Sequence, residues 1–182
     1  MIGQCFGTYI LAQKGESLWI IDKHAAHERI LYEQVKSQRR ASSQVLLEPV
    51  SVTLPAEEYA VALDNLELLL QAGIVAENFG GSSLLVREAP LDLAGQEIPA
   101  LVSEVAGLLL SHKKDITPAR LEWIFHSVAC RAAIKAHDRT TLPEMQSLAE
   151  RVLCSSDILY CPHGRPVAFE LPRGDLEKKF GR

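Results

Sequence analysis

The spacing of hydrophobic and polar positions changes near Asp22. Before that point, the apolar stretches 6–12 and 17–21 flank a turn centred on Gly15, a pattern typical of a β-hairpin. After it, apolar positions recur at helical spacing over about 24–40. We therefore expect a buried strand to end, and a helix to begin, close to Asp22.

The middle of the chain predicts a compact β-α-β-β-α unit. Short apolar runs bounded by turn residues favour strands, whereas the longer periodic stretches favour helices. The predicted elements are a strand at 50–54, a helix from Pro55 to a stop at Gly73, strands at 74–79 and 83–87 joined by Gly80-Gly81, and a helix at 100–110.

The last third predicts a long helix, a shorter helix, a loop, a strand and a final short helix. Thr117 is the expected N-cap of the long helix, with Pro118 at its first position. Apolar residues occupy more than one side of it, so we expect it to be buried. The chain shows no internal repeat, and its order of elements indicates an α+β fold. The remaining elements are a helix at 142–153, a strand at 167–170 and a helix at 174–180.

Composition limits the classes of function. A chain of 182 residues can bury a core without disulfides or metals, so a bound metal would serve a function. The four cysteines are irregularly spaced, and neither a signal peptide nor a membrane-length apolar run is visible, which predicts a reducing cytoplasm. The net charge of −4 gives no broad electrostatic attraction for nucleic acid. The opening residues run directly into a strand pattern, as expected for a domain of a longer protein.

The predicted strand-to-helix corner carries candidate metal ligands. Asp22 ends the strand, and four-residue spacing places His24 and Glu28 on one face of the helix. Three polar groups beside a buried strand favour a metal or cationic partners, although Asp22 alone is more often a helix-capping or loop carboxylate than a ligand. His27 lies off this face and is expected at the surface. Glu33 also lies off it, and we expect a supporting or ion-pair role for its carboxylate.

A second candidate cluster lies near the end of the chain. Cys161 and His163 are one residue apart in a loop that contains proline and glycine, and thiolate and imidazole favour zinc. An inert buried cysteine beside a loop histidine is the alternative. Cys130, inside the long helix, is by pattern alone a packing residue. Arg131 and Arg165 can hold phosphate oxygens or neutralise carboxylates.

Three motifs and a closing tripeptide follow one another along the chain. Together they resemble the C-terminal domain of the MutL family of DNA mismatch repair proteins, in the subset with a latent endonuclease. Lys23 departs from the glutamine usual in that subset, and we expect its side chain to point away from the candidate ligands. The segments are Asp22-Lys23-His24-Ala25-(two residues)-Glu28-(four residues)-Glu33, Ala129-Cys130-Arg131, Cys161-Pro162-His163-Gly164-Arg165-Pro166 and Phe180-Gly181-Arg182.

The resemblance implies an enzyme that nicks duplex DNA, with weak activity in isolation. It implies Zn²⁺ in a structural or regulatory role and Mn²⁺ or Mg²⁺ for catalysis, and it promotes Cys130 from packing residue to ligand. Asp22, His24 and Glu28 are the expected catalytic residues, with Glu33, Arg131 and Arg165 supporting them or contacting phosphate. The implied metal site is lined by Asp22, His24, Glu28, Cys130, Cys161 and His163.

The resemblance also implies a domain division. Residues 1–46 and 117–182 would form a discontinuous dimerisation and endonuclease subdomain, and residues 47–116 an inserted external, regulatory one. A homodimer needs an apolar sheet face. Candidates for that face are Phe6, Tyr9, Ile10, Leu11, Val167 and Phe169.

Further partners follow from the resemblance. The segment Gln44-Val45-Leu46-Leu47-Glu48-Pro49 is similar to a motif that docks on the processivity sliding clamp, with Gln44, Leu47 and Pro49 as its contacts; an ordinary linker is the alternative. Duplex DNA, and the mismatch-recognition protein MutS through the full-length protein, are the other expected partners, in the nucleoid-associated bacterial cytoplasm.

Two other functions compete with the endonuclease. One is a dimerisation and clamp-binding module whose zinc is purely structural. The other is a zinc hydrolase of small molecules, against which the chain has no His-Glu-x-x-His helix.

Overall fold

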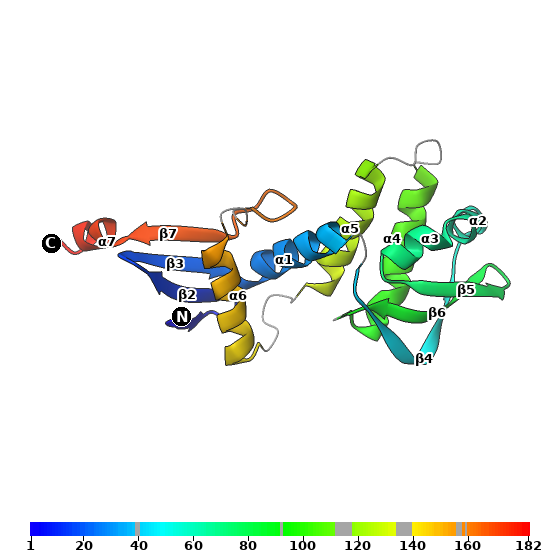
Figure 1. Ribbon diagram of the computed structural model, residues 1–182, viewed down its shortest axis with the longest axis horizontal. Coiled ribbons are helices and arrows are strands. Elements are labelled where there is room, and N and C mark those ends of the chain that lie inside the picture. Colours follow the sequence, from blue (N-terminus) through cyan, green and yellow to red (C-terminus); the bar gives the residue numbers. More distant parts are fainter. Residues whose placement is uncertain (39–40, 92, 112–117, 134–139, 156–157, 159) are drawn as a thin grey trace. The chain divides into compact units, whose positions relative to one another are not determined.

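The fold is α+β, as the sequence predicts, with a four-stranded and a three-stranded antiparallel sheet (Figure 1). The computed structural model describes residues 1–38, 41–91, 93–111, 118–133, 140–155, 158 and 160–182. The chain divides into two compact units. The first unit comprises Met1–Ile30 and Ala133–Arg182, and the second comprises Leu31–Ala132.

The first unit contains the four-stranded sheet, in the order β1-β2-β3-β7. The predicted hairpin forms around Gly15, whose φ of +58° suits a tight turn. Strand β3 then pairs with the last strand of the chain, so Ile21 lies opposite Ala168. The strands are β1 (Gly3–Cys5), β2 (Tyr9–Lys14), β3 (Ser17–Asp22) and β7 (Ala168–Pro172).

Helices cover one face of this sheet. Ile10, Ala12 and Ile21 alternate toward the helices and are fully buried, as the two-residue period of a strand requires. Figure 1 shows α6 crossing β2, against which it packs. The covering helices are α1 (Lys23–Gln38), whose residues up to Ile30 belong to this unit, and α6 (Leu142–Cys154). The last helix of the unit, α7 (Arg173–Lys179), follows β7 and packs against it.

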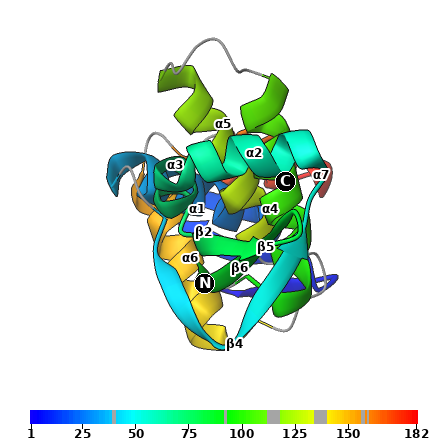
Figure 2. The ribbon, with the colours of Figure 1, turned by 90° about the vertical axis from the view of Figure 1, so that its right-hand side faces the viewer.

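The second unit contains the sheet β4-β6-β5, with α2 and α3 beside β5 (Figure 2). Its strands are β4 (Ser43–Thr53), β5 (Val75–Gly80) and β6 (Ser83–Pro90). The strand expected at 50–54 begins earlier, at Ser43. Its pairing with β6 is interrupted between Val45 and Val50, where the register shifts.

The helix expected from Pro55 to Gly73 is two helices, and this prediction is wrong. The chain breaks at Asn65, where φ is −128° and the side-chain amide donates a hydrogen bond to the carbonyl of Val61 at 2.7 Å. Such local bonds compete with the helical ladder. The helices of this unit are α2 (Ala56–Asp64), α3 (Leu66–Gln71), the short 3-10 helix η1 (Gly95–Glu97), α4 (Ile98–Ser111) and α5 (Pro118–Ala132).

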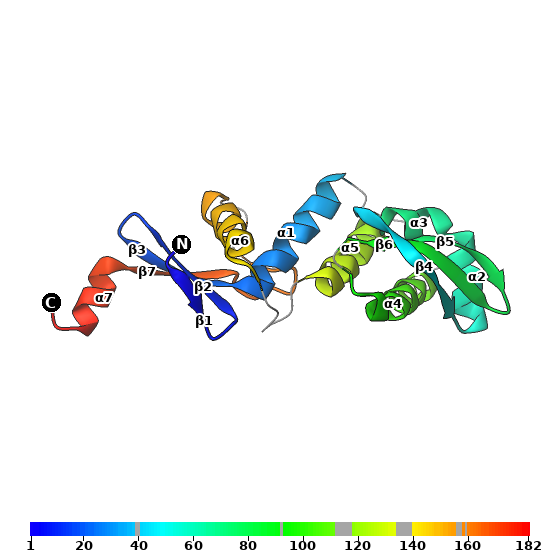
Figure 3. The ribbon, with the colours of Figure 1, turned by 90° about the horizontal axis from the view of Figure 1, so that it is seen from below.

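Helices α4 and α5 pack side by side in the core of the second unit (Figure 3). Ile124, Phe125 and Val128 of α5 are buried there. The other side of α5 is not buried as expected, since Trp123 is 55% exposed. The expected N-cap, Thr117, lies outside the described residues.

The second unit extends over Leu31–Ala132, beyond the expected bounds at residues 46 and 117. The difference results from packing. Val35 and Ala41 share one hydrophobic core with Ile124 and Phe125, so the end of α1 and all of α5 belong to the second unit. Within the described parts of the chain, no helix combines the length and apolar character needed to cross a bilayer.

Candidate metal centre

The corner between β3 and α1 is fixed by hydrogen bonds at both ends of the turn. The Asp22 carboxylate accepts a hydrogen bond from the Ala25 N–H at 2.9 Å, and the Lys23 N–H donates to the Thr8 carbonyl at 3.0 Å. Asp22 is therefore the N-cap of α1. The Lys23 side chain is fully buried, while His24 is half-buried on the first turn.

The Glu28 carboxylate is the central polar group of the first unit. Its side chain is 0% exposed, and Oε1 lies 2.7 Å from Nδ1 of His163. A terminal nitrogen of Arg165 lies 3.7 Å from Oε2. Two distant segments of the sequence therefore meet at one buried carboxylate, as a composite site requires.

The loop that carries His163 and Arg165 is closed on itself. The Cys161 N–H donates to the Arg165 carbonyl, and the Gly164 N–H donates to the Cys161 carbonyl, both at 2.8 Å. Gly164 adopts a φ of +78°, which favours glycine. Arg29 of α1 donates to the Tyr160 carbonyl at 3.3 Å, which ties the helix to the loop.

The guanidinium of Arg165 links three of the predicted site residues. A hydrogen bond with the Cys161 sulfur, together with the charges of Cys161, Glu28 and Asp22, raises the pKa of Arg165 above its usual value, although partial burial opposes this. Cys161 itself is buried. The positive charge of Arg165 thus offsets the anionic groups gathered on this side of the first unit.

In the second unit, His126 and Cys130 form a pair on α5. The Nε2 atom of His126 lies 3.8 Å from Sγ of Cys130, because a spacing of four residues places both on one helix face. Both side chains are half-buried. His126 is not among the site residues predicted from the sequence. Its four-residue spacing to Cys130 within a predicted helix was the available signal.

Arg131, next to Cys130, is held by carboxylates of its own unit. Its guanidinium lies 3.0 Å from Glu97 and 2.6 Å from Glu104. Burial lowers the pKa of Arg131, but the hydrogen bonds and charges of Glu104 and Glu97 outweigh it and raise the pKa above the usual value. Arg131 was expected either to hold phosphate oxygens or to neutralise carboxylates. In the structure it neutralises the carboxylates of Glu97 and Glu104.

Each unit thus carries candidate ligands of mixed type. The first unit brings Glu28 and His163 together, with Cys161 in the loop that carries His163, and the second unit pairs His126 with Cys130. Carboxylate, imidazole and thiol are groups that Zn²⁺ accepts, so the residue types of both units fit zinc by their chemistry. Two further expected ligands, Asp22 and His24, lie at the start of α1 in the first unit. Glu33 is half-buried on the part of α1 that belongs to the second unit.

The face of the first sheet that the helices leave uncovered is apolar. Leu11 pairs with Ile20, and Ile20 pairs with Phe169, so these side chains form a row across three strands. Phe169 is 60% exposed and Tyr9 is 38% exposed. Two residues expected on this face are instead fully buried in the unit's own core. Strand alternation turns Ile10 inward, whereas Val167 precedes β7 and is outside its alternation.

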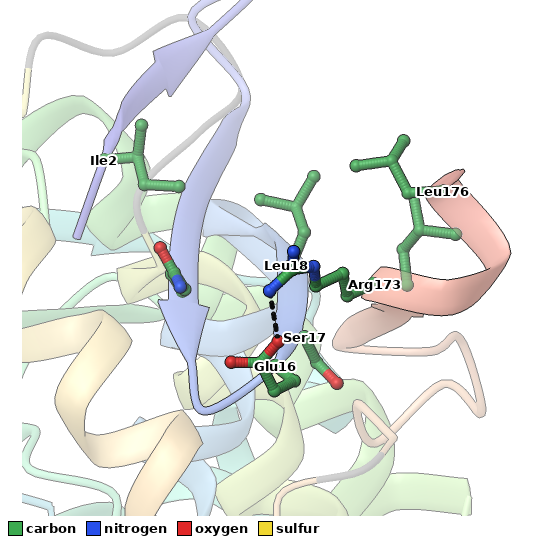
Figure 4. A pocket seen from close by; sticks show the side chains of 8 residues that line it. Ile2, Glu16, Ser17, Leu18, Arg173 and Leu176 are labelled. Atoms are coloured by element: carbon green, nitrogen blue, oxygen red, sulfur yellow. Dashed lines mark hydrogen bonds and ion pairs between the residues drawn. The ribbon is translucent and has the colours of Figure 1, made fainter. Parts of the chain in front are cut away.

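A pocket of about 350 Å³ lies in the same unit (Figure 4). Leu18 of β3 and Leu176 of α7 contribute its apolar walls. Arg173, at the start of α7, lies 2.9 Å from Glu16 at its edge.

The segment expected to dock on a sliding clamp lies in β4, at an edge of the second sheet. Gln44 and Pro49 are exposed, and Leu47 is exposed to 104% of its reference area. Residues 46–49 leave the ladder with β6, because pairing is interrupted between Val45 and Val50.

Comparisons with known proteins agree on one family. The family model of the MutL C terminal dimerisation domain matches residues 2–140. The DNA mismatch repair protein MutL of Clostridium botulinum is 36% identical over 185 residues, covering 100% of this chain and 28% of that protein. MutL of Clostridium tetani is 35% identical over 188 residues, covering 100% and 30%, and MutL of Beijerinckia indica is 36% identical over 184 residues, covering 98% and 29%. The chain therefore spans less than a third of the length of these relatives, and it belongs to the MutL family as a C-terminal dimerisation domain of a DNA mismatch repair protein.

Proposed function

We propose that this domain carries a metal-dependent endonuclease that nicks one strand of duplex DNA during mismatch repair. The observation that carries the proposal is the contact between the fully buried Glu28 carboxylate and His163 at 2.7 Å. A buried carboxylate against an imidazole is typical of a metal or catalytic site, because burying a charge is costly unless it is paired. The family motifs support the same conclusion, since all of them are present and Lys23 is their noted departure.

The ligand types suggest two classes of ion. Glu28, Cys161 and His163 of the first unit would hold zinc, because nitrogen and sulfur donors favour zinc. The family motif adds Cys130 to the proposed ligands. Mn²⁺ or Mg²⁺ prefers oxygen donors. A bound divalent ion would lower the pKa of a coordinated water and offset the charge that develops on the phosphate.

The chain's own residues would prepare the site for that chemistry. Asp22 and Glu28 would supply carboxylate oxygens, and His24 would act beside them. Arg165 would hold a phosphate oxygen, since a guanidinium matches the phosphate geometry. Glu33 and Arg131 would support these groups, Arg131 by keeping α5 against α4 through Glu104.

Nicking of supercoiled plasmid by this chain in the presence of Mn²⁺ tests the proposal. Asp22→Asn removes the negative charge of the side chain but keeps its capping function, because asparagine can still cap α1. Glu28→Gln keeps the side-chain shape. Glu77→Gln is the matched control, because Glu77 is an exposed carboxylate that pairs with Arg87 in the second unit. We expect nicking by the parent and the control only. The proposed endonuclease activity is rejected if the parent does not nick the plasmid at high protein concentration.

The alternative function is a nuclease-inactive module with a structural zinc. One observation favours it: Asp22 already uses an oxygen to cap α1. In that case the chain would bind zinc and dimerise, and Mn²⁺ would produce no nicking.

The proposed partners are a second copy of the chain, duplex DNA and the sliding clamp. The family's dimerisation role supports the homodimer. The face that we assign to it is the row of half-buried Leu11 and Ile20 and exposed Phe169. Exposed Leu47 and Pro49 support clamp docking. Contact with MutS is proposed for the full-length protein. Because the net charge is −4, DNA would have to be delivered by these other contacts.

A further inference from the structure

Both oxygens of the buried Glu28 carboxylate face side chains of one loop. Oε1 lies 2.7 Å from Nδ1 of His163, and Oε2 lies 3.7 Å from a terminal nitrogen of Arg165. The second distance is longer than a hydrogen bond. The Arg165 side chain is also 59% exposed, whereas that of Glu28 is 0% exposed. Arg165 can therefore leave Glu28 without any opening of the core.

The other partners of Arg165 belong to the same proposed site. Its guanidinium forms a hydrogen bond with the Cys161 sulfur and is attracted by Asp22. Asp22, Glu28 and Cys161 are also three of the proposed metal ligands. A guanidinium and a divalent ion thus depend on the same acceptors, and two cations placed that close repel each other.

We infer that Arg165 is an exchangeable counter-ion that couples metal binding to the binding of a DNA phosphodiester. With an ion bound at Glu28 and Cys161, the guanidinium would turn toward solvent, where its planar fork can hold two phosphate oxygens. The inference rests on the proposed endonuclease and adds a reciprocal link between its two ligands. By linkage, DNA must strengthen metal binding by the same factor by which the metal strengthens DNA binding.

Zinc affinity of the 182-residue chain, measured by competition with a chromophoric chelator, tests this link. Each protein is titrated with and without a short DNA duplex. For the parent, we expect the duplex to tighten zinc binding by about fivefold or more. Arg165→Gln should bind zinc about threefold to tenfold more tightly than the parent without DNA, because the repulsion is removed. In this variant the duplex should no longer change zinc affinity.

Two further variants complete the experiment. Arg173→Gln is the matched control, because Arg173 is 63% exposed in the same unit and pairs with Glu16 and Glu177. It should behave as the parent. Arg165→Lys keeps the charge but cannot span two acceptors. Its zinc affinity should lie between those of the parent and Arg165→Gln. If circular dichroism shows that Arg165→Gln is unfolded, Arg165→Lys is compared with the parent in its place.

The outcomes separate the inference from the proposed function. An Arg165→Gln variant that binds zinc no more tightly than the parent, or that keeps the DNA effect, overturns the inference alone. A parent chain that binds neither zinc nor Mn²⁺ overturns the proposed metal centre as well.

Discussion

Glu28 and His163 are in direct contact, with 2.7 Å between Oε1 and Nδ1, although the second turn of α1 and the loop before β7 lie far apart in the sequence. The two side chains differ in solvent exposure, because Glu28 is 0% exposed and His163 is 45% exposed. A buried carboxylate and an accessible imidazole form a site that is fixed on one side and open on the other.

We expect Glu28→Gln to lower zinc affinity by about tenfold or more, because the buried ligand loses its charge. Zinc that binds only the folded chain at a hundred times its Kd would add about 2.7 kcal/mol to the free energy of unfolding. Zinc should therefore raise the Tm of the parent and of the Glu77→Gln control, but not of Glu28→Gln. Differential scanning calorimetry with and without zinc measures this. An equal rise in Tm for Glu28→Gln would exclude Glu28 as a ligand.

Phe169→Asp should convert the dimer to monomers, because it places a charge at the exposed residue of the apolar row that crosses the first sheet. Phe79→Asp is the matched control: Phe79 is 61% exposed in the second unit and Phe169 is 60% exposed. Sedimentation equilibrium gives the mass of each variant. A Phe169→Asp variant that remains dimeric would mean that another surface carries the dimer.

Leu47→Ala should weaken binding to the sliding clamp by about tenfold or more, as expected for an anchor residue of an interface. Stability should not change, since Leu47 buries no surface in the described structure. Val45→Ala is the control within the same strand, at 77% exposure. Surface plasmon resonance on immobilised clamp compares the two, and equal affinities for parent and Leu47→Ala would contradict docking through β4.

Arg131→Gln and Arg165→Gln should differ in DNA binding. Arg131 is held by Glu97 and Glu104, so its loss should leave the salt dependence of DNA affinity unchanged and cost about 1 kcal/mol of stability. Loss of Arg165 should reduce the salt slope by about one phosphate contact. Fluorescence anisotropy at several salt concentrations measures both slopes. A reduced slope for Arg131→Gln would show that it contacts phosphate after all.

Glu144 should give the protein a pH-dependent stability. Its carboxylate accepts hydrogen bonds from the Thr141 N–H at 2.6 Å and hydroxyl at 2.8 Å, which lower the pKa of Glu144 below its usual value of 4.5. A lowered pKa in the folded state means that the ionised form stabilises folding. That contribution is complete above the usual pKa and disappears as the pH falls through the lower, folded-state pKa.

Thermal unfolding tests this sign. Glu144→Gln should unfold at a lower temperature than the parent at neutral pH, and the difference should shrink below about pH 4.5. Glu150→Gln, at an exposed position of the same helix, should show no such trend. A difference between parent and Glu144→Gln that grows toward acid pH would contradict the assignment.

The corner at Asp22 could be predicted because two local signals agree there. Apolar alternation ends, helical spacing begins, and a carboxylate that can cap the helix stands between them. The contact of Glu28 with His163 could be anticipated only through the family motifs, because chain topology and not local pattern brings α1 beside the later loop.

Other features could not be predicted for physical reasons. Helical spacing of Leu63, Leu66 and Leu69 continues through Asn65, whose side-chain hydrogen bond breaks the helix without disturbing that pattern. His126 lies in a predicted helix rich in apolar residues, and only its four-residue spacing to Cys130 distinguishes it from a packing residue. The bounds of the units depend on which core Val35 joins, and that is decided by tertiary packing.

The interruption in β4 has a consequence for behaviour at high concentration. An uninterrupted outer strand exposes a row of backbone donors and acceptors on which further chains can stack, the starting point of fibrous aggregates. Between Val45 and Val50 the ladder is broken, and Pro49 lacks a backbone N–H. The segment that exposes Leu47 is therefore a poor template for fibril growth. The protein can keep this apolar side chain exposed without polymerising.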